Sequence, residues 1–173
     1  LCLNGEWQCE IDQSDSGLER GLLQRDLESR ILVPFCPESP LSGIGKRDFL
    51  QVVWYKRQVE VPAAWSGKRV LLHFQAVDYD ATVWIDGVEV KRHRGGFTPF
   101  TCELGKRAGQ TLTITVRARD DHRIPQPRGK QSQQYDDYAC FYTRTTGIWQ
   151  TVWLEPVPET ALRRPRITPD VAN

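Results

Sequence analysis

Short runs of alternating apolar and polar residues, each ended by a proline or glycine turn, are the feature that most limits how this chain can fold. In residues 70–76, VLLHFQA, alternate positions are apolar, and in residues 111–118, TLTITVRA, the alternation is the most regular in the sequence. A period of two buries one face of a β-strand and leaves the other in water. No run of ten or more residues has convincing helical spacing. The pattern therefore predicts an all-β fold, an antiparallel β-sandwich.

The turns fix the order of the predicted strands. Asp86-Gly87 follows the apolar run 82–85 and tolerates positive φ, so we expect a tight hairpin that pairs residues 88–91 with 82–85. The segment 12–30 is rich in charge and is predicted to be a loop with one helical turn. Further strands are expected at residues 7–11, 31–33, 48–61 and 151–157, the last of them as the partner of 112–118.

Composition excludes several classes of protein. A chain of 173 residues fits one domain, and its net charge of +1 gives no basic surface of the kind that nucleic-acid binding needs. No apolar run approaches the roughly 20 residues that span a bilayer, so no membrane partner is expected. Five unpatterned cysteines indicate free thiols, which favours a reducing, cytoplasmic compartment. A start at Leu1 without any methionine suggests a piece of a longer protein.

Two separated motifs carry a family resemblance. WIDG at residues 84–87 leads into HRGGFTPF at 93–100, and TTGIWQTVWLEPV follows at 145–157. In this order they resemble the N-terminal jelly-roll, or sugar-binding, domain of glycoside hydrolase family 2, which contains β-galactosidases, β-glucuronidases and β-mannosidases. The resemblance implies a jelly roll over residues 1–158. It also implies that 159–173 form a linker and the start of an immunoglobulin-like domain.

The same resemblance implies a role without catalysis. The whole enzyme would hydrolyse O-glycosyl bonds of terminal β-linked sugars such as β-galactosides, and its catalytic carboxylates would lie on a C-terminal barrel that this chain lacks. We therefore expect the fragment alone to be inactive, with no cofactor and no catalytic residue. Its partners would be carbohydrate, bound weakly or only in the full-length enzyme, and the immunoglobulin-like and barrel domains.

Adjacent carboxylates could suggest chemistry of their own, because retaining glycosidases need two carboxyl groups about 5 Å apart. Asp120-Asp121 and Asp136-Asp137 lie in a predicted loop, where solvated acidic turns are the expected structure. Asp78 and Asp80 beside Tyr79 are interpreted as a turn that caps its own backbone rather than as a calcium site. His93 lacks a second ligand nearby in sequence and is predicted to form structural hydrogen bonds, so no metal site is expected.

The long segment 120–146 is the predicted functional loop. It exceeds the usual ~4–6 residues of a connection and mixes aromatic rings, which stack on sugar rings, with polar groups that bind hydroxyls. By analogy with the resembled enzymes it would reach the substrate pocket. An alternative is that it is a docking surface for the next domain. The candidate residues at the substrate rim are Lys130, Gln131, Tyr135, Asp136, Asp137 and Arg144.

Two other functions stay open on the sequence alone, because sandwich domains host many functions. A freestanding carbohydrate-binding module would carry an exposed row of aromatic residues on a concave face or loop edge. A purely structural interaction domain would instead associate only with the missing domains.

Overall fold

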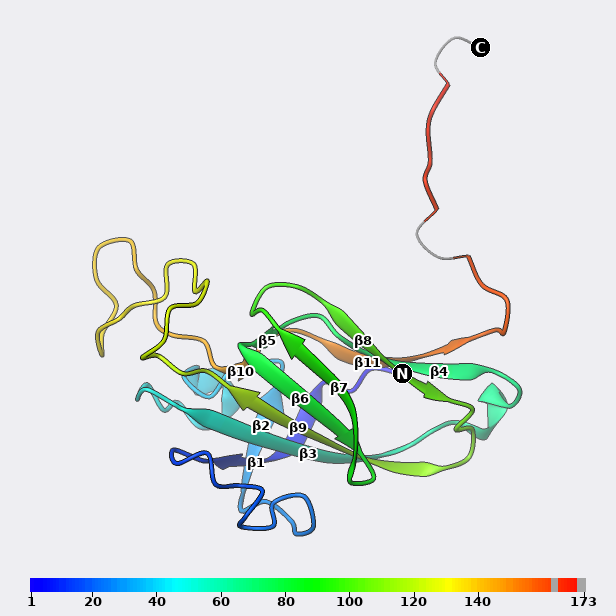
Figure 1. Cartoon of the computed structure of the whole chain (residues 1–173), viewed down its shortest axis with the longest axis horizontal. Coiled ribbons are helices and arrows are strands. Elements are labelled where there is room, and N and C mark those ends of the chain that lie inside the picture. The colour runs from blue at the N-terminus through cyan, green and yellow to red at the C-terminus, as the bar shows by residue number, and fades with distance from the viewer. Residues whose placement is uncertain (163–164, 171–173) are drawn as a thin grey trace.

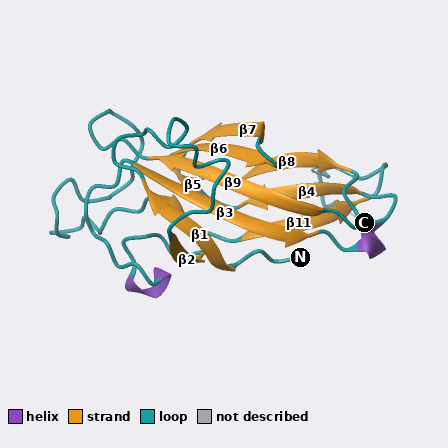
Figure 2. Cartoon of the chain, turned by 90° about the horizontal axis from the view of Figure 1, so that it is seen from below, coloured by secondary structure: helices purple, strands orange, loops and turns teal. Residues whose placement is uncertain are grey.

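The computed structural model describes residues 1–162 and 165–170 and forms an antiparallel β-sandwich (Figure 1). Two layers of strands face each other, and most of the loops gather at the two ends of the layers (Figure 2). The prediction of an all-β sandwich is confirmed. The strands are β1 (Gly5–Ile11), β2 (Ser29–Val33), β3 (Val52–Glu60), β4 (Arg69–Phe74), β5 (Val77–Asp78), β6 (Asp80–Ile85), β7 (Val88–Arg94), β8 (Phe100–Gly105), β9 (Thr111–Arg119), β10 (Gly147–Ile148) and β11 (Val152–Val157).

The larger layer is a six-stranded sheet in the order β2-β1-β3-β9-β6-β7, and the opposite layer is a three-stranded sheet in the order β11-β4-β8. The short strands β5 and β10 form a separate pair. The hairpin between β6 and β7 forms as predicted, with φ of 52° at Asp86 and 80° at Gly87. Two short 3-10 helices, η1 (Pro40–Ser42) and η2 (Ala63–Trp65), lie in connections. No helix in the described part of the chain is long and apolar enough to cross a membrane.

The main core lies between the sheets and follows from the alternation. In β9 the inward residues Leu112, Ile114, Val116 and Ala118 are buried against apolar side chains of the opposite sheet. Each apolar side chain buried in this way contributes roughly 1.5–3 kcal/mol relative to its exposed state. The alternation therefore identifies the inner face of the six-stranded sheet.

The predicted pairing of residues 112–118 with 151–157 is wrong. Strand β9 pairs with β3 and β6, whereas β11 pairs with β4 in the other sheet, with Val152 opposite Phe74. Strands β9 and β11 both bury an alternate set of apolar residues, so their patterns alone are compatible with pairing between them. Alternation shows which face of a strand is buried but not which strand lies beside it.

The segment between β1 and β2 covers part of the outer face of the six-stranded sheet. Leu22 and Leu27 pack there on Trp54, whose ring stacks on Trp84 with centroids 5.5 Å apart. The buried ammonium of Lys56 donates to the carbonyls of Leu22, Leu23 and Arg25. The alternation in 48–61 predicts one solvated face, and this is wrong for Val52 to Lys56 because the covering segment buries both faces.

Candidate functional site

The loop 120–146 leaves the end of β9 and returns into β10, and it projects from one end of the sandwich (Figure 1). The chain that follows β11 leaves from the opposite end (Figure 1). At its base the loop is fastened by Gln131, whose side-chain nitrogen donates to Asp78 Oδ2 at 2.6 Å and whose oxygen accepts from the Thr145 N–H at 3.0 Å. Gln131 is buried. One amide thus joins the middle of the loop and its C-terminal end to strand β5.

Arg144 is the second anchor of the loop and is also buried. Its guanidinium donates to the carbonyls of Gln134, Tyr135 and Arg47 and lies over the Phe49 ring, 4.0 Å from the centroid. Burial is the largest cause that lowers the pKa of Arg144 below its ordinary value. None of the ion pairs between described residues includes Arg144, so its charge is balanced by carbonyl dipoles rather than by a paired carboxylate.

Three buried carboxylates stand beneath the loop, and each is bound by a different loop residue. Glu38 accepts from the Thr146 N–H at 3.2 Å, Asp78 accepts from Gln131, and Asp120 accepts from Arg128 Nη1 at 2.6 Å. Burial is the largest cause that raises the pKa of all three, to about 7 for Asp78. For Asp120 the positive charge of Arg128 opposes that rise.

The positions of these carboxylates show that two of the predictions from the sequence are wrong. Asp120 is not part of a solvated turn, because it is buried in a salt bridge with Arg128. Asp78 does not cap its own turn but reaches the loop, and Asp80 pairs with Arg94 at 3.3 Å. The expected structural role of His93 is confirmed by the hydrogen bond, 3.1 Å long, between Nε2 and Thr98 Oγ1.

Beneath the loop lies a cavity of about 720 Å³, which we call the loop cavity. Its lining combines aromatic rings, two cationic side chains without a carboxylate partner, and amide and hydroxyl groups. That mixture suits a small polar ring with a negative group, since rings stack on apolar faces and guanidinium groups bind carboxylates. The lining residues are Phe49, His122, Arg123, Ile124, Pro125, Gln126, Arg128, Gly129, Gln131, Ser132, Gln133, Phe141 and Arg144.

Of the six predicted rim residues, the structure brings Gln131 and Arg144 into the lining of the loop cavity and leaves the other four outside it. Asp136 and Asp137 are exposed and pair with Arg47 at 3.6 Å and 2.8 Å. Lys130 and Tyr135 are also exposed. The hydrogen bonds of Gln131 and Arg144 hold the loop together, so these two side chains shape the cavity as well as face it.

Sequence reasoning missed Phe49, His122 and Arg123. Phe49 lies far from the loop in sequence, and its ring contacts that of His122 with centroids 4.7 Å apart. Nothing in the local pattern around Phe49 indicates this contact. His122 and Arg123 follow Asp120-Asp121 inside the predicted loop, and their position in that loop could have identified them as candidates.

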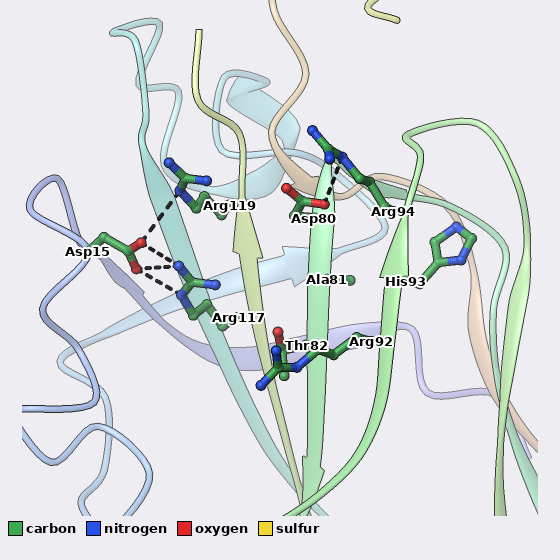
Figure 3. A pocket seen from close by; sticks show the side chains of 9 residues that line it. All are labelled: Asp15, Asp80, Ala81, Thr82, Arg92, His93, Arg94, Arg117 and Arg119. Carbon is green, nitrogen blue, oxygen red and sulfur yellow. Dashed lines mark hydrogen bonds and ion pairs between the residues drawn. The ribbon is translucent and has the colours of Figure 1, made fainter. Parts of the chain in front are cut away.

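A second cavity, of about 380 Å³, lies on the outer face of the six-stranded sheet (Figure 3). We call it the arginine groove. Strands β6, β7 and β9 form its floor, and the turn that carries Asp15 forms one side. Its lining residues are Asp15, Asp80, Ala81, Thr82, Arg92, His93, Arg94, Arg117 and Arg119.

Comparison with known families gives one clear match. Residues 41–158 match the family described as glycosyl hydrolases family 2, sugar binding domain. A β-glucuronidase of Paenibacillus borealis is 33% identical over 118 residues, which cover 66% of this chain and 20% of that protein. A β-galactosidase of Thermoanaerobacter pseudethanolicus is 29% identical over 123 residues, which cover 68% of this chain and 15% of that protein. The chain thus spans about a fifth or less of these relatives.

Solved structures agree with the fold. A β-glucuronidase from an uncultured Clostridium species superimposes with a TM-score of 0.71 at 26% identity, over 92% of this chain and 29% of that one. The crystal structure of Ruminococcus gnavus β-glucuronidase superimposes with a TM-score of 0.72 at 22% identity, over 92% of this chain and 29% of that one. The alignments extend over the sandwich and leave more than two thirds of each neighbour unmatched.

Proposed function

Because the chain belongs to the sugar-binding domain family of the family 2 glycosyl hydrolases, we propose that it is the non-catalytic N-terminal domain of an enzyme that hydrolyses terminal β-linked glycosides. Its task is to form one wall of the substrate site with the loop 120–146, while the catalytic carboxylates lie elsewhere in the longer protein. The loop cavity at one end of the sandwich is the observation that supports this role most directly.

The carboxylates of the chain support the non-catalytic part of the proposal. A retaining glycosidase needs an acid and a nucleophile that both face the scissile bond. Asp78 and Asp120 are buried and are absent from the lining of the loop cavity, while Asp136 and Asp137 are exposed and paired with Arg47. Among the described residues no two carboxylates face the cavity together.

The cavity also favours one class of sugar. Arg123 and Arg144 line it, and no ion pair between described residues engages either of them. Carbonyl groups already accept from the buried guanidinium of Arg144, so the exposed Arg123 is the cation that favours an anionic ligand. We propose a β-glucuronide rather than a β-galactoside as the substrate of the full-length protein, in line with the β-glucuronidases among the relatives.

The test is an NMR titration of this chain with glucuronic acid and with galactose, together with an assay for release of nitrophenol from the two nitrophenyl β-glycosides. We expect no turnover and saturable, millimolar shifts for glucuronic acid, about −4 kcal/mol, since only part of the site is present. In Arg123→Gln the preference for glucuronic acid should disappear, whereas Arg107→Gln, which lies outside the cavity, should retain it.

The outcomes separate the competing functions. Turnover by the pure chain would contradict the non-catalytic role. Equal shifts with both sugars would contradict the substrate class. A freestanding carbohydrate-binding module is the second candidate, favoured by exposed aromatic residues at the loop edge, namely Phe97, Tyr135, Tyr138 and Tyr142. Tight retention of the chain on an insoluble neutral glycan would support that candidate instead.

A further inference from the structure

The outer face of the six-stranded sheet is covered in part. The segment between β1 and β2 packs over β3 and over Trp84 of β6, and it leaves most side chains of β7 exposed. Four arginines project from the uncovered part of this face (Figure 3). The register of β9, β6 and β7 places these arginines in two rows, each of three residues, that cross the sheet. The rows are Arg119–Asp80–Arg94 and Arg117–Thr82–Arg92.

The geometry of the rows follows from the sheet. Neighbouring strands lie about 4.8 Å apart, so the arginines of β9 and β7 start roughly 10 Å from each other, with a small side chain on β6 between them. Residues two apart on one strand are separated by about 7 Å. Long guanidinium side chains can therefore converge on one ligand above Thr82. The cavity that they line is open and contains no aromatic side chain apart from His93.

The charges in the groove are unequal, with four arginines and two aspartates among its nine lining residues. Asp15 accepts hydrogen bonds from Arg117 and lies 3.5 Å from Arg119 Nε, and these two arginine side chains are only 18% and 31% exposed. The position of Asp15 shows that Arg117 and Arg119 together can bind a carboxylate on this face of the sheet. Arg92 and Arg94 differ, because their side chains are 75% and 60% exposed.

The acidic partners of these two exposed arginines are weak competitors for a ligand. Arg92 donates two hydrogen bonds to Glu89, three residues earlier on the same strand, and Arg94 Nε lies 3.3 Å from Asp80 Oδ1. Water and salt screen exposed pairs of this kind, so their net contribution to stability is small. An external anion with several charged groups can replace such partners, because guanidinium groups bind carboxylates and sulfates in a bidentate manner.

The groove is longer than one cavity. A neighbouring cavity of about 360 Å³ shares Asp15, Thr82, Arg92 and Arg117 with it and extends over the outer face to Leu18, Trp84 and Glu89. The site is therefore elongated along β6. Its length suits a chain of linked units rather than a single small ion.

The floor of the groove disfavours a peptide as that chain. Strand β6 is hydrogen-bonded to β9 on one side and to β7 on the other, so its backbone has no free edge for an added strand. Nucleic acid is also disfavoured, because the net charge of the chain is only +1 and the arginine groove has no aromatic platform for bases. A chain of linked units that has many hydroxyl groups and occasional negative groups matches the Thr82 and arginine side chains best.

We propose that the arginine groove is a second binding site, separate from the loop cavity, for an anionic oligosaccharide that carries carboxylate or sulfate groups. It binds through the exposed Arg92 and Arg94 on β7, with Arg117, which Asp15 holds in place, on the β9 side of the ligand. This site does not depend on the proposed hydrolytic function, since its ligand binds on the face of the sheet and not beneath the loop 120–146.

The experiment is an NMR titration of the chain that follows the amide of Thr82 and the side-chain Nε–H groups of the arginines. The probes are tetragalacturonate, a heparin-derived hexasaccharide, neutral cellotetraose, a polyglutamate peptide and oligothymidylate. We expect saturable shifts with one or both anionic oligosaccharides, weakened by added salt, and none with cellotetraose. The two anionic sugars distinguish carboxylate from sulfate as the favoured group.

Matched variants distinguish a site from general charge attraction. Arg92→Gln/Arg94→Gln should weaken binding by about tenfold or more, since it removes two charge-assisted contacts. Arg30→Gln/Lys106→Gln removes the same charge from exposed positions outside the groove and should leave binding unchanged. Asp80→Asn, which removes a like charge from the floor, should strengthen binding.

Three results would overturn the proposal. Equal weakening by both double variants would show non-specific attraction. Binding of polyglutamate or oligothymidylate as tight as that of the sugars would assign the groove to another class of partner. Weaker binding in Asp80→Asn would show that the carboxylate supports the ligand rather than repels it. None of these results bears on catalysis or on the loop cavity.

Discussion

At the scale of single residues, Asp78 is the most unusual group in the chain. It is buried, its Oδ2 accepts one hydrogen bond from Gln131, and its Oδ1 has no partner among the described residues. Burial, followed by the negative charge of Asp120, raises its pKa to about 7, while Gln131 and Arg128 act in the opposite direction. A proton on Asp78 therefore stabilises the junction between β5 and the loop.

This shift predicts a pH dependence of stability. An unfolded aspartate loses its proton near pH 3.8, and folded Asp78 does so near pH 7, so the folded state binds an extra proton between these values. The contribution of Asp78 to the free energy of unfolding should therefore be fully present below about pH 4 and be lost as the pH rises to about 7, by at most about 4 kcal/mol. Glu38 and Asp120, whose pKa values are also raised, act in the same direction.

The variant Asp78→Asn isolates the contribution of this residue. The amide resembles the protonated acid and keeps an acceptor for Gln131, so the variant should lose the part of the pH dependence that belongs to Asp78 and be more stable than the parent at pH 8. Urea unfolding from pH 4 to 8 measures this, with exposed Asp48→Asn as the matched control that should follow the parent. A decline in Asp78→Asn parallel to that of the parent would refute the assignment.

Gly147 gives a second prediction at this scale. Its φ is +81°, and a Cβ added there would lie 2.0 Å from the hydroxyl oxygen of Tyr55, which accepts a hydrogen bond from the Ile148 N–H. Gly147→Ala should therefore lower the free energy of unfolding by at least about 3 kcal/mol. Gly105→Ala has a similar φ of +71° but open space around it, so it should cost only about 1 kcal/mol.

Thermal and urea unfolding of the two glycine variants provide the comparison. The difference between them measures the contact with Tyr55, because backbone strain is common to both. If the two variants are equally stable, the close approach of Gly147 to Tyr55 is not what requires a glycine in this motif.

At the scale of elements, the segment between β1 and β2 acts as a cover for the six-stranded sheet. It consists of turns rather than a helix, yet Leu22 is fully buried against Trp54 and Trp84. Asp12 strengthens this cover, because its carboxylate accepts from the Gly17 N–H at 2.7 Å and from the indole of Trp54 at 3.2 Å. A charged, irregular sequence thus gains its order from the sheet beneath it.

Leu22→Ala should cost about 2–5 kcal/mol, as for other large-to-small changes in a core. It should also increase hydrogen exchange in the cover more than in β9, because the cover lacks a sheet ladder of its own. Leu18→Ala in the same segment is the control, since Leu18 is 56% exposed and its loss should be nearly neutral. Unchanged exchange in the cover of Leu22→Ala would show that other contacts hold it.

The same elements show how far the sequence is predictive. The strand at 111–119, the Asp86-Gly87 hairpin and the position of the long loop follow from local patterns and motifs, because period and turn chemistry are local properties. The neighbour of each strand and the burial of Asp78 do not follow from local patterns. Gln131 reaches Asp78 across 53 positions of sequence, and Phe49 reaches His122 from another element. Such contacts depend on the assembled sandwich.

At the scale of the whole molecule, the functional features are separated by the sheets. The loop cavity lies at one end, the arginine groove lies on an outer face, and the chain after β11 leaves from the opposite end (Figure 1). The loop and the exit of the chain can therefore contact different neighbours at the same time. Strand β11 ends at Val157, and the domain boundary at residue 158 and the immunoglobulin-like domain beyond it stay predictions.

The pairing of the first residues with the last strand has a consequence for synthesis. Leu1 exchanges hydrogen bonds with Leu154, and β11 completes the smaller sheet by pairing with β4. Contacts between residues so distant in sequence form slowly, because the loop between them must close first. On the ribosome, the edge of β4 that pairs with β11 would stay unpaired until Val157 has emerged, and in that interval the nascent chain exposes a strand edge that is prone to aggregation.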